Sequence, residues 1–176
     1  MPLQSVQLTP VSDDEYTEFA ALQVVEYAHQ LVRANEVSAD EGIAVARARL
    51  TDLLAGRLRA AGHALFVVRS ALDAARVGWV WLSPAPAFLG AGHERTRWLS
   101  QITIESGERG KGWGRATLVE MERQMAAAGV EQIWLRVFDW NVVARLLYLS
   151  CGYLLAQQFE VDAHLYKKLS SSASEV

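Results

Sequence analysis

Residues 109–114 read Arg-Gly-Lys-Gly-Trp-Gly, which places three glycines within six positions. The stretch before them, 97–104, carries Ile102 and Ile104 two positions apart, a spacing typical of a β-strand. The stretch after them, 112–128, has apolar residues at helical spacing. The first amides of a helix lack internal partners and carry partial positive charge, and glycines let an anion approach the backbone. The sequence therefore predicts a pyrophosphate-binding turn between a strand and a helix.

Three basic side chains, Arg109, Lys111 and Arg115, add positive charge around this turn. Its glycine spacing departs from the G-x-G-x-x-G pattern of dinucleotide-binding folds. It also departs from the P-loop, in which Gly-Lys is followed by Ser or Thr, because Gly112 and Trp113 follow Lys111 here. Taken alone, the segment leaves open a second interpretation, a tight turn with solvated basic side chains.

A second segment, 138–153, places Asn141, Ala144 and Tyr148 on one face of a predicted helix, since they are separated by three and seven positions. This face offers an amide, a small gap and a phenol. Considered singly, Asn141 is typical of a helix N-cap and Tyr148 of a core residue. The occurrence of this face after the glycine-rich turn is the stronger indication that the two segments form one binding site.

The hydrophobic pattern of the whole chain predicts seven strands and four helices. The strands are expected near 3–8, 63–69, 76–82, 97–104, 133–137, 153–159 and 163–169, and the helices near 13–33, 38–62, 112–128 and 141–150. Ser12 with Glu15, and Ser38 with Glu41, have the spacing of a capping box at the start of the first two helices. No repeat or linker interrupts the pattern, so we expect one α/β domain of the α+β type over residues 1–169 and a flexible tail over 170–176.

Composition limits the classes of function. The chain has 176 residues, 51% of them hydrophobic, and a net charge of −3, which favours a globular protein and argues against a nucleic-acid partner. Cys151 is the single cysteine, and no signal peptide or membrane-spanning run is visible, so a cytoplasmic protein without membrane partners is expected. The four histidines lack the spacing of metal ligands, and no metal is predicted.

At these two segments the sequence resembles the GNAT superfamily of acetyl-coenzyme A-dependent N-acetyltransferases. The family pattern Arg/Gln-x-x-Gly-x-Gly/Ala matches residues 109–114, and the pattern Asn-x-x-Ala-x-x-x-Tyr followed by Gly-Phe/Tyr matches 141–153. The resemblance implies a central, twisted, mostly antiparallel sheet of about seven strands flanked by about four helices. It also implies acetyl transfer from acetyl-coenzyme A directly to a primary amine, either of a small molecule or of a peptide.

The resemblance further implies roles for individual residues. The fourth strand would separate from the fifth, so that the Ile104 backbone amide stabilises the oxyanion and Tyr148 protonates the leaving thiolate. Asn141 would bind the amides of the pantetheine arm, and Ala144 would leave room for that arm. The complete set of expected cofactor-binding residues is Ile102, Thr103, Ile104, Arg109, Gly110, Lys111, Gly112, Trp113, Gly114, Arg115, Asn141, Ala144 and Tyr148.

The sequence identifies the residues that would bind the acceptor amine less specifically than those that would bind the cofactor. The N-terminal half resembles a bacterial branch of the superfamily with a Glu-Tyr pair in its first helix, here Glu26-Tyr27, where the family places acceptor contacts. That branch carries acidic residues in a pattern like Asp-Ile-Glu-Ile before the glycine turn, whereas this chain has Gln101 and Thr103 at the acidic positions. Trp98 lies nearby and is a candidate for an aromatic acceptor pocket.

The missing carboxylates leave the general base open. The candidates are Glu105, the loop residues His93 and Glu94, the Glu26-Tyr27 pair, and a water chain. The absence of the acidic residues also supports an alternative function, a catalytically weakened module that binds or senses acyl-coenzyme A. The acyl chain length and the acceptor stay open, and a homodimer is expected only because dimers are frequent in such families.

Overall fold

The computed structural model describes residues 4–33, 35–54 and 62–170. The predicted order of elements is confirmed. The strands are β1 (Val6–Pro10), β2 (Ala64–Ser70), β3 (Arg76–Pro84), β4 (Thr96–Ile104), β5 (Gln132–Phe138), β6 (Leu154–Gln158) and β7 (Asp162–Lys168). The helices are α1 (Asp13–Arg33), α2 (Gly42–Leu54), α3 (Trp113–Ala127) and α4 (Val142–Ser150), with short 3₁₀ helices η2 (Ala87–Leu89) and η3 (Ser106–Glu108).

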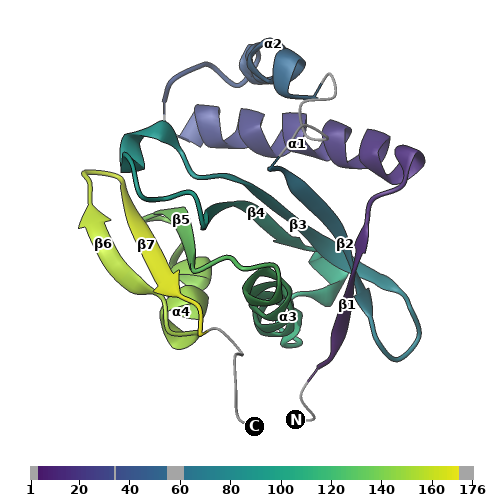
Figure 1. The fold of residues 1–176 in the computed structure, drawn as a ribbon. Coiled ribbons are helices and arrows are strands. Elements are labelled where there is room, and N and C mark those ends of the chain that lie inside the picture. The colour runs from purple at the N-terminus through teal and green to yellow at the C-terminus, as the bar shows by residue number, and fades with distance from the viewer. Residues whose placement is uncertain (1–3, 34, 55–61, 171–176) are drawn as a thin grey trace, which may run out of the picture. The chain divides into compact units, whose positions relative to one another are not determined.

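All seven strands belong to one sheet in the order β1-β2-β3-β4-β5-β7-β6. The β6–β7 hairpin forms one edge and β1 the other, as Figure 1 shows. The pairs β3–β4, β5–β7 and β6–β7 are antiparallel, and β4–β5 is parallel. The parallel pair arises because α3 connects β4 to β5 as a crossover, and α3 packs against β4. The expected mixed, mostly antiparallel fold class is therefore confirmed.

The chain forms two compact units, one made of residues 1–9 with 65–176 and one made of residues 10–64. The predicted single domain over 1–169 stays a prediction, and most of the predicted tail, 171–176, lies outside the described residues. The smaller unit is the helix pair α1 and α2. Its core is a group of small and aliphatic side chains from both helices: Val24, Ala28, Leu31 and Ala46.

The predicted capping box at Ser12 is formed, and at Ser38 the bonds from the serine to the glutamate are formed while the Glu41 amide donates to the Ser38 carbonyl instead of its hydroxyl. The Ser12 amide donates to Glu15 Oε2 at 3.0 Å, and the Glu15 amide donates back to Ser12 Oγ at 3.3 Å. Before α2, Ser38 Oγ donates to Glu41 Oε2 at 2.6 Å. This hydrogen bond from the Ser38 hydroxyl, together with one from its backbone amide, lowers the pKa of Glu41. The pattern Ser-x-x-Glu therefore marks the start of α1 at Asp13, and before α2 it stabilises the turn that leads into Gly42.

Two element boundaries differ from the predictions. The first strand was expected at residues 3–8, but it spans Val6–Pro10 and Leu3 lies outside the described residues. Pro10 is tolerated at the end of β1 because this strand is at the sheet edge and needs no donor on its open side. The second helix begins at Gly42 and is described as far as Leu54, and the predicted continuation falls on residues 55–61, outside the described part.

Gly78 in β3 is required by a close approach of two strands. It lies opposite Ile104 at the end of β4, and a Cβ at this position would overlap the carbonyl oxygen of Thr103. We expect Gly78→Ala to lower the free energy of unfolding by about 3 kcal/mol, because the overlap is with backbone and can be relieved only by moving β4. Denaturant unfolding measures the loss, and Gly107→Ala, at a position with open space, is the control. Equal stability of Gly78→Ala and its parent would contradict this packing.

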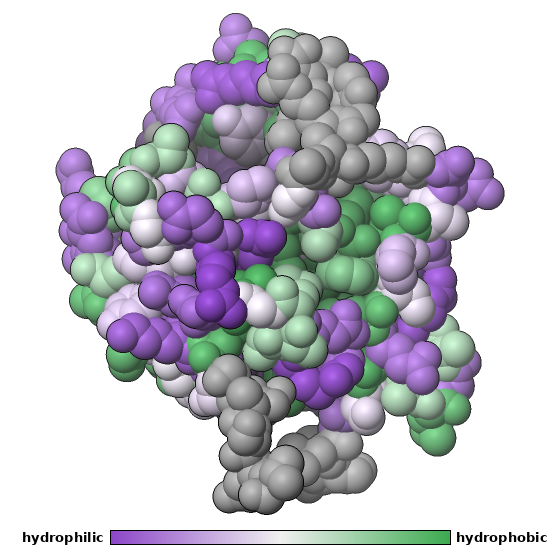
Figure 2. Space-filling model, in the orientation of Figure 1, coloured by the Kyte–Doolittle hydropathy of each residue, from purple (hydrophilic) through white to green (hydrophobic). Residues whose placement is uncertain are grey.

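In the described part of the chain, each helix is either too short or too polar to cross a bilayer. Figure 2 shows hydrophilic and hydrophobic side chains interspersed over one face of the molecule.

Candidate active site

Strands β4 and β5 form a fork. Their parallel pairing runs from Thr96 opposite Gln132 to Leu99 opposite Leu135 and then ends, although β4 continues to Ile104. The separation coincides with a β-bulge, because the register of β4 against β3 shifts at Ser100. A bulge bends and twists its strand, which accounts for the divergence. The Ser100 hydroxyl shares a hydrogen bond of 2.8 Å with that of Ser83 in β3, which holds the bulge in place.

The open edge of β4 presents unused backbone groups to the fork. The Glu105 amide donates to Val77 of β3 at 2.9 Å, so the amide of residue 105 faces β3. Successive residues of a strand direct their amides to opposite edges, so the amides of Ile102 and Ile104 face the fork. Arg109 Nε donates to the Ile104 carbonyl at 3.0 Å from the same side. The predicted separation of the two strands is therefore present, and both isoleucine amides are available to an extended ligand.

The glycine-rich turn connects the end of β4 to α3. Gly110 has φ of 75° and Gly112 φ of 93°, conformations that favour glycine. Gly112 is the N-cap of α3 and supplies no capping side chain; a Cβ there would lie 3.6 Å from Gln4 Cγ, and one at Gly110 would meet nothing within 4 Å. The first amides of α3 therefore stand beside open space, which fits a bound pyrophosphate. A Cβ on Gly114 would lie 3.0 Å from Leu147 Cδ2, so this glycine lets α3 and α4 pack closely.

The basic side chains of the glycine-rich turn form hydrogen bonds with other groups of the protein. Lys111 Nζ donates to Glu108 Oε1 at 2.9 Å, and Trp113 Nε1 donates to Glu108 Oε2 at 2.8 Å. These bonds, that of Lys111 first, lower the pKa of Glu108. Arg115 donates to the Ser150 hydroxyl at 2.7 Å and to its carbonyl at 3.2 Å, so it caps the end of α4. Sequence reasoning grouped Arg115 with the phosphate ligands and did not anticipate this second use.

Helix α4 lies beside the turn and carries the second predicted face. Asn141 is its N-cap, with Oδ1 accepting from the Ala144 amide at 3.3 Å, and this leaves the side-chain NH₂ for other partners. Tyr148 is 7% exposed, and among the described residues its hydroxyl makes no hydrogen bond. Burial raises the pKa of Tyr148 well above its ordinary value. The phenol therefore keeps its proton throughout the physiological range and is suited to donate a hydrogen bond.

The side chains just before the glycine-rich turn have protein partners that their predicted roles did not include. The Glu105 carboxylate accepts from Arg76 Nε at 2.6 Å, on the β3 side, so it is held away from the open edge of β4. Gln101 Nε2 donates to Thr103 Oγ1 at 3.0 Å, so the two side chains that replace the acidic pair satisfy each other. The role of Glu105 as a general base stays a prediction, which this ion pair disfavours.

The predicted acceptor residues fall in both units. Glu26 and Tyr27 belong to α1 in the smaller unit, where Tyr27 packs against the helical core and accepts a 3.5 Å hydrogen bond from Arg49. Trp98 belongs to β4, at the fork, and contacts Phe88 and His164 edge-on. Sequence analysis missed Phe88 and His164, because they are 76 positions apart and no local pattern joins them.

The other candidate bases in the loop before β4 are bound locally. His93 Nδ1 shares a 3.2 Å hydrogen bond with Thr96, and its ring contacts Trp134 edge-on. Glu94 accepts from the Gly92 amide at 3.3 Å, and hydrogen bonds from its own amide and from that of Gly92 lower its pKa. Both side chains therefore stabilise the loop.

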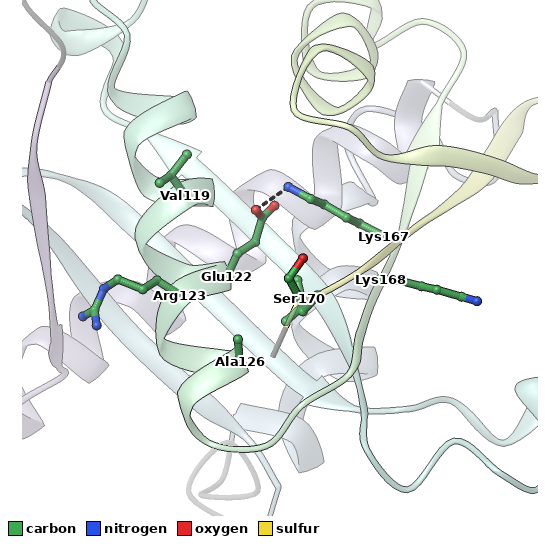
Figure 3. A pocket seen from close by; sticks show the side chains of 8 residues that line it. Val119, Glu122, Arg123, Ala126, Lys167, Lys168 and Ser170 are labelled. Atoms are coloured by element: carbon green, nitrogen blue, oxygen red, sulfur yellow. Dashed lines mark hydrogen bonds and ion pairs between the residues drawn. The ribbon is translucent and has the colours of Figure 1, made fainter. Parts of the chain in front are cut away.

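A pocket of about 230 Å³ lies between α3 and the end of β7 (Figure 3). Glu122 points across it to Lys167, whose Nζ also donates to the Cys151 carbonyl at 2.8 Å. Because Cys151 is the C-cap of α4, the pair connects α3, β7 and the end of α4, the helix that carries Tyr148. The pocket is lined by α3 and the end of β7, and Lys167 joins both to α4.

Removal of Lys167 tests this connection. Lys167→Met leaves the Glu122 carboxylate, which is 11% exposed, without its cation. We expect the free energy of unfolding to fall by about 3 kcal/mol, because a buried charge that loses its partner keeps its desolvation cost. Urea denaturation measures it, with Lys168→Met at the adjacent exposed position as the control. Similar losses in both variants would show that the Lys167–Glu122 ion pair does not contribute specifically to the free energy of unfolding.

Comparisons with known proteins identify the family of the chain. Residues 33–153 match the Acetyltransferase (GNAT) family. The chain is 24% identical over 165 residues to YycN of Bacillus subtilis (strain 168), an uncharacterised N-acetyltransferase, covering 94% of this chain and 99% of that protein.

Solved structures share the fold. The crystal structure of the B. subtilis acetyltransferase YycN has a TM-score of 0.77 at 23% identity, covering 88% of this chain and 96% of that one. The PaiA N-acetyltransferase of Thermoplasma acidophilum, solved with coenzyme A, has a TM-score of 0.67 at 15% identity, with 93% and 99% covered. The spermidine N-acetyltransferase of Vibrio cholerae, solved with coenzyme A and spermine, has a TM-score of 0.67 at 18% identity, with 95% and 97% covered. The chain belongs to the acetyltransferase (GNAT) family.

Proposed function

We propose that this transferase moves an acetyl group from acetyl-coenzyme A directly to a primary amine. One observation carries the proposal: the fork between β4 and β5 opens beside a glycine-rich helix N-terminus. An extended pantetheine arm fits the unpaired edge of β4, and a pyrophosphate fits the free amides of α3. Structural neighbours solved in complex with coenzyme A support this class of co-substrate.

In this proposal the residues of the chain have the following roles. The amides of Ile102 and Ile104 pair with the pantetheine arm, and that of Ile104 donates to the thioester oxygen as negative charge develops on it. The Asn141 amide group and the gap at Ala144 accommodate the arm. Tyr148 donates its proton to the departing thiolate, for which a phenol that is neutral at physiological pH is suited. The thioester supplies an acyl group that is already activated for attack by an amine.

The acceptor is a primary amine of a small molecule or a peptide. Structural neighbours include proteins named for spermidine, which supports a small amine as the class to test first. The second candidate function is a sensor that binds acyl-coenzyme A without turnover. It is favoured by Gln101 and Thr103, which bond to each other and offer no carboxylate at the positions where the related branch has acids.

Two measurements test the proposed function. Isothermal titration with acetyl-coenzyme A and with coenzyme A reports binding, and thiol release in the presence of a panel of primary amines reports transfer. We expect micromolar to submillimolar binding of both, with turnover on at least one amine. Binding without turnover on any amine would support the sensor, and absence of binding at millimolar concentration would remove the basis of both functions.

A further inference from the structure

Helix α4 carries apolar side chains on two sides. Five of its nine residues are valine or leucine. On the inner side, Leu147 packs against Gly114 of α3, and Tyr148 is buried. On the outer side four aliphatic residues are exposed to solvent: Val142, Val143, Leu146 and Leu149. A helix that is apolar on both sides is normally enclosed by protein, so the outer side of α4 lacks the cover that its composition predicts.

The exposed side of α4 adjoins strand β6. This strand follows α4 after a short turn and runs back along it, because Arg145 of α4 donates to Gln158 at the far end of β6 at 3.1 Å. Arg145 therefore lies on the side of α4 next to β6. Val142 and Leu149 are three and four positions from Arg145, so they share that side. Figure 1 shows α4 beside the β6–β7 hairpin.

Strand β6 is an open sheet edge without charged residues. It is the last strand in the sheet order and reads Leu-Leu-Ala-Gln-Gln, with all five residues exposed. Its two leucines lie on opposite faces of the sheet, since Leu155 is opposite the buried Leu165 and Leu154 is opposite Tyr166. Edge strands of soluble proteins often carry lysine or proline, which prevent pairing with another strand. β6 has neither, whereas β1 at the other edge ends at Pro10.

The exposed aliphatic residues of α4 and β6 are extensive enough for a protein–protein contact. We call them the α4–β6 surface: Val142, Val143, Leu146, Leu149, Leu154 and Leu155. Together they expose on the order of 600 Å², which is the upper limit of the largest apolar patch on a typical monomer. A standard interface takes about 800 Å² from each partner. The adjacent Gln157 and Gln158, which are also exposed, provide a polar rim that supplies the remaining area.

We propose that the α4–β6 surface is the contact between two copies of this chain. A two-fold axis relates the copies and pairs the outer edges of the two β6 strands antiparallel. The aliphatic residues of each α4 then pack against the other copy. Such a dimer does not depend on acetyl transfer.

The self-complementarity of the surface favours a second copy as its occupant. A two-fold contact brings the same residues of both copies together, and an uncharged apolar surface allows this without repulsion between like charges. An open strand edge also complements itself, because two identical strands can pair antiparallel about a two-fold axis. The bulge between Leu155 and Gln157 limits the length of this pairing, so the aliphatic side chains form most of the contact.

A lipid surface fits these residues less well. Helices that lie on membranes carry lysine or arginine beside their apolar side, where these residues attract anionic lipids. Arg145 is the basic residue of α4, and it is bound by Asp139 at 2.7 Å and by Gln158. An open strand edge is also unfavourable in hydrocarbon, because its backbone groups would have no hydrogen-bond partners there.

The proposed contact leaves the candidate active site open. The fork lies between β4 and β5, and β7 and β6 separate β5 from the contact edge. Ala144 and Tyr148 are four positions apart and lie on the inner side of α4, opposite the exposed residues. Each copy therefore keeps a complete fork, and the second copy covers α4 from its outer side.

Sedimentation equilibrium of the full chain tests the assembly. We expect twice the mass of one chain at about 50 µM protein, because interfaces of standard size have micromolar or stronger affinity. A parent that stays monomeric at this concentration would overturn the proposal.

Leu146→Glu tests the helical part of the contact. The new carboxylates of both copies would lose water at the contact and meet no cation, so we expect the Kd of the dimer to rise about 10²-fold or more. Val119→Glu is the matched control, because Val119 is an aliphatic residue of α3 with 58% exposure, close to the 61% of Leu146. Its Kd should stay within about threefold of the parent, since exposed charges are screened. Equal Kd values for the two variants would contradict the assignment of this surface, and thermal unfolding checks that both fold.

Cysteine substitutions test the strand part of the contact. In a Cys151→Ala background, a cysteine is placed in turn at each position from 154 to 158, and the dimer is oxidised. Opposite residues of an antiparallel pair have Cα atoms about 4.5–5.5 Å apart, within the range of a disulfide. We expect at least one variant, with its cysteine at the two-fold axis, to form a covalent dimer. Leu72→Cys in the exposed β2–β3 turn is the control, and five variants that cross-link no more than this control would overturn the pairing of β6.

Cosedimentation with vesicles of phosphatidylserine and phosphatidylcholine distinguishes a second copy from a membrane. We expect the parent and Leu146→Glu to remain equally in the supernatant. Vesicle binding by the parent that Leu146→Glu abolishes would assign the α4–β6 surface to lipid and overturn the dimer.

Discussion

Gly112→Glu is expected to weaken coenzyme A binding by about 10³-fold or more. Gly112 has φ of 93°, a conformation that costs another residue roughly 1–2 kcal/mol. The new carboxylate would stand at the N-terminus of α3, where the helix dipole and free amides favour the phosphate charge. Repulsion between the two anions adds to the strain, and a total of about 4 kcal/mol corresponds to a thousandfold change in Kd.

Isothermal titration of parent and variant measures this effect. Gly107→Glu is the matched control, because it adds the same charge to the same connection at a glycine with open space and no positive φ. We expect the control to bind within about threefold of the parent, since exposed charges are strongly screened. Thermal unfolding of all three proteins separates lost binding from lost structure. Comparable weakening at both positions would show that the turn does not hold the pyrophosphate.

Tyr148→Phe is expected to lower kcat about 10³-fold while the KM for acetyl-coenzyme A changes little. The hydroxyl is the only part removed, and it acts on the thiolate that appears late in the reaction, so ground-state binding is preserved. Because burial raises the pKa of Tyr148, the parent should show no loss of kcat from tyrosine ionisation up to at least pH 9. Steady-state thiol release over pH 6–9 measures both effects.

Tyr153→Phe is the control for this substitution. Tyr153 contacts the Tyr148 ring at 5.7 Å and is likewise buried. Removal of its hydroxyl should leave kcat unchanged, because the substitution keeps the ring and its packing against Tyr148. A loss of activity in Tyr153→Phe as large as in Tyr148→Phe would indicate that ring packing, rather than proton donation, is responsible.

The local features of the fold and of the site were predictable because short-range physics sets them. The capping boxes at Ser12 and Ser38 depend on residues three positions apart. The glycine turn depends on backbone conformations that non-glycine residues rarely adopt, so its glycines are visible in the sequence itself. The spacing of Asn141, Ala144 and Tyr148 follows from the helical repeat.

The side-chain partners of the site were not predictable in this way. Arg115 was expected near phosphate, but it binds Ser150, and Glu105 was considered a base, but it binds Arg76. Each of these contacts joins residues about thirty positions apart in the sequence. Arginine and glutamate side chains are long and flexible, so each could reach several alternative partners. Only the packing of α3 against α4 and the register of β3 against β4 select one of them.

By itself, then, the amino-acid sequence determined the order of the elements, the glycine-rich turn before α3 and the face of α4 that carries Tyr148, because each depends on the nearest turns of the chain. The fork between β4 and β5 and the ring contact between Trp98 and His164 depend on the tertiary structure. The bulge at Ser100 ends the β4–β5 pairing, and the register of β5 with β7 sets His164 beside Trp98. Register between strands distant in sequence is set by the burial of whole sheet faces, a property that no short segment carries.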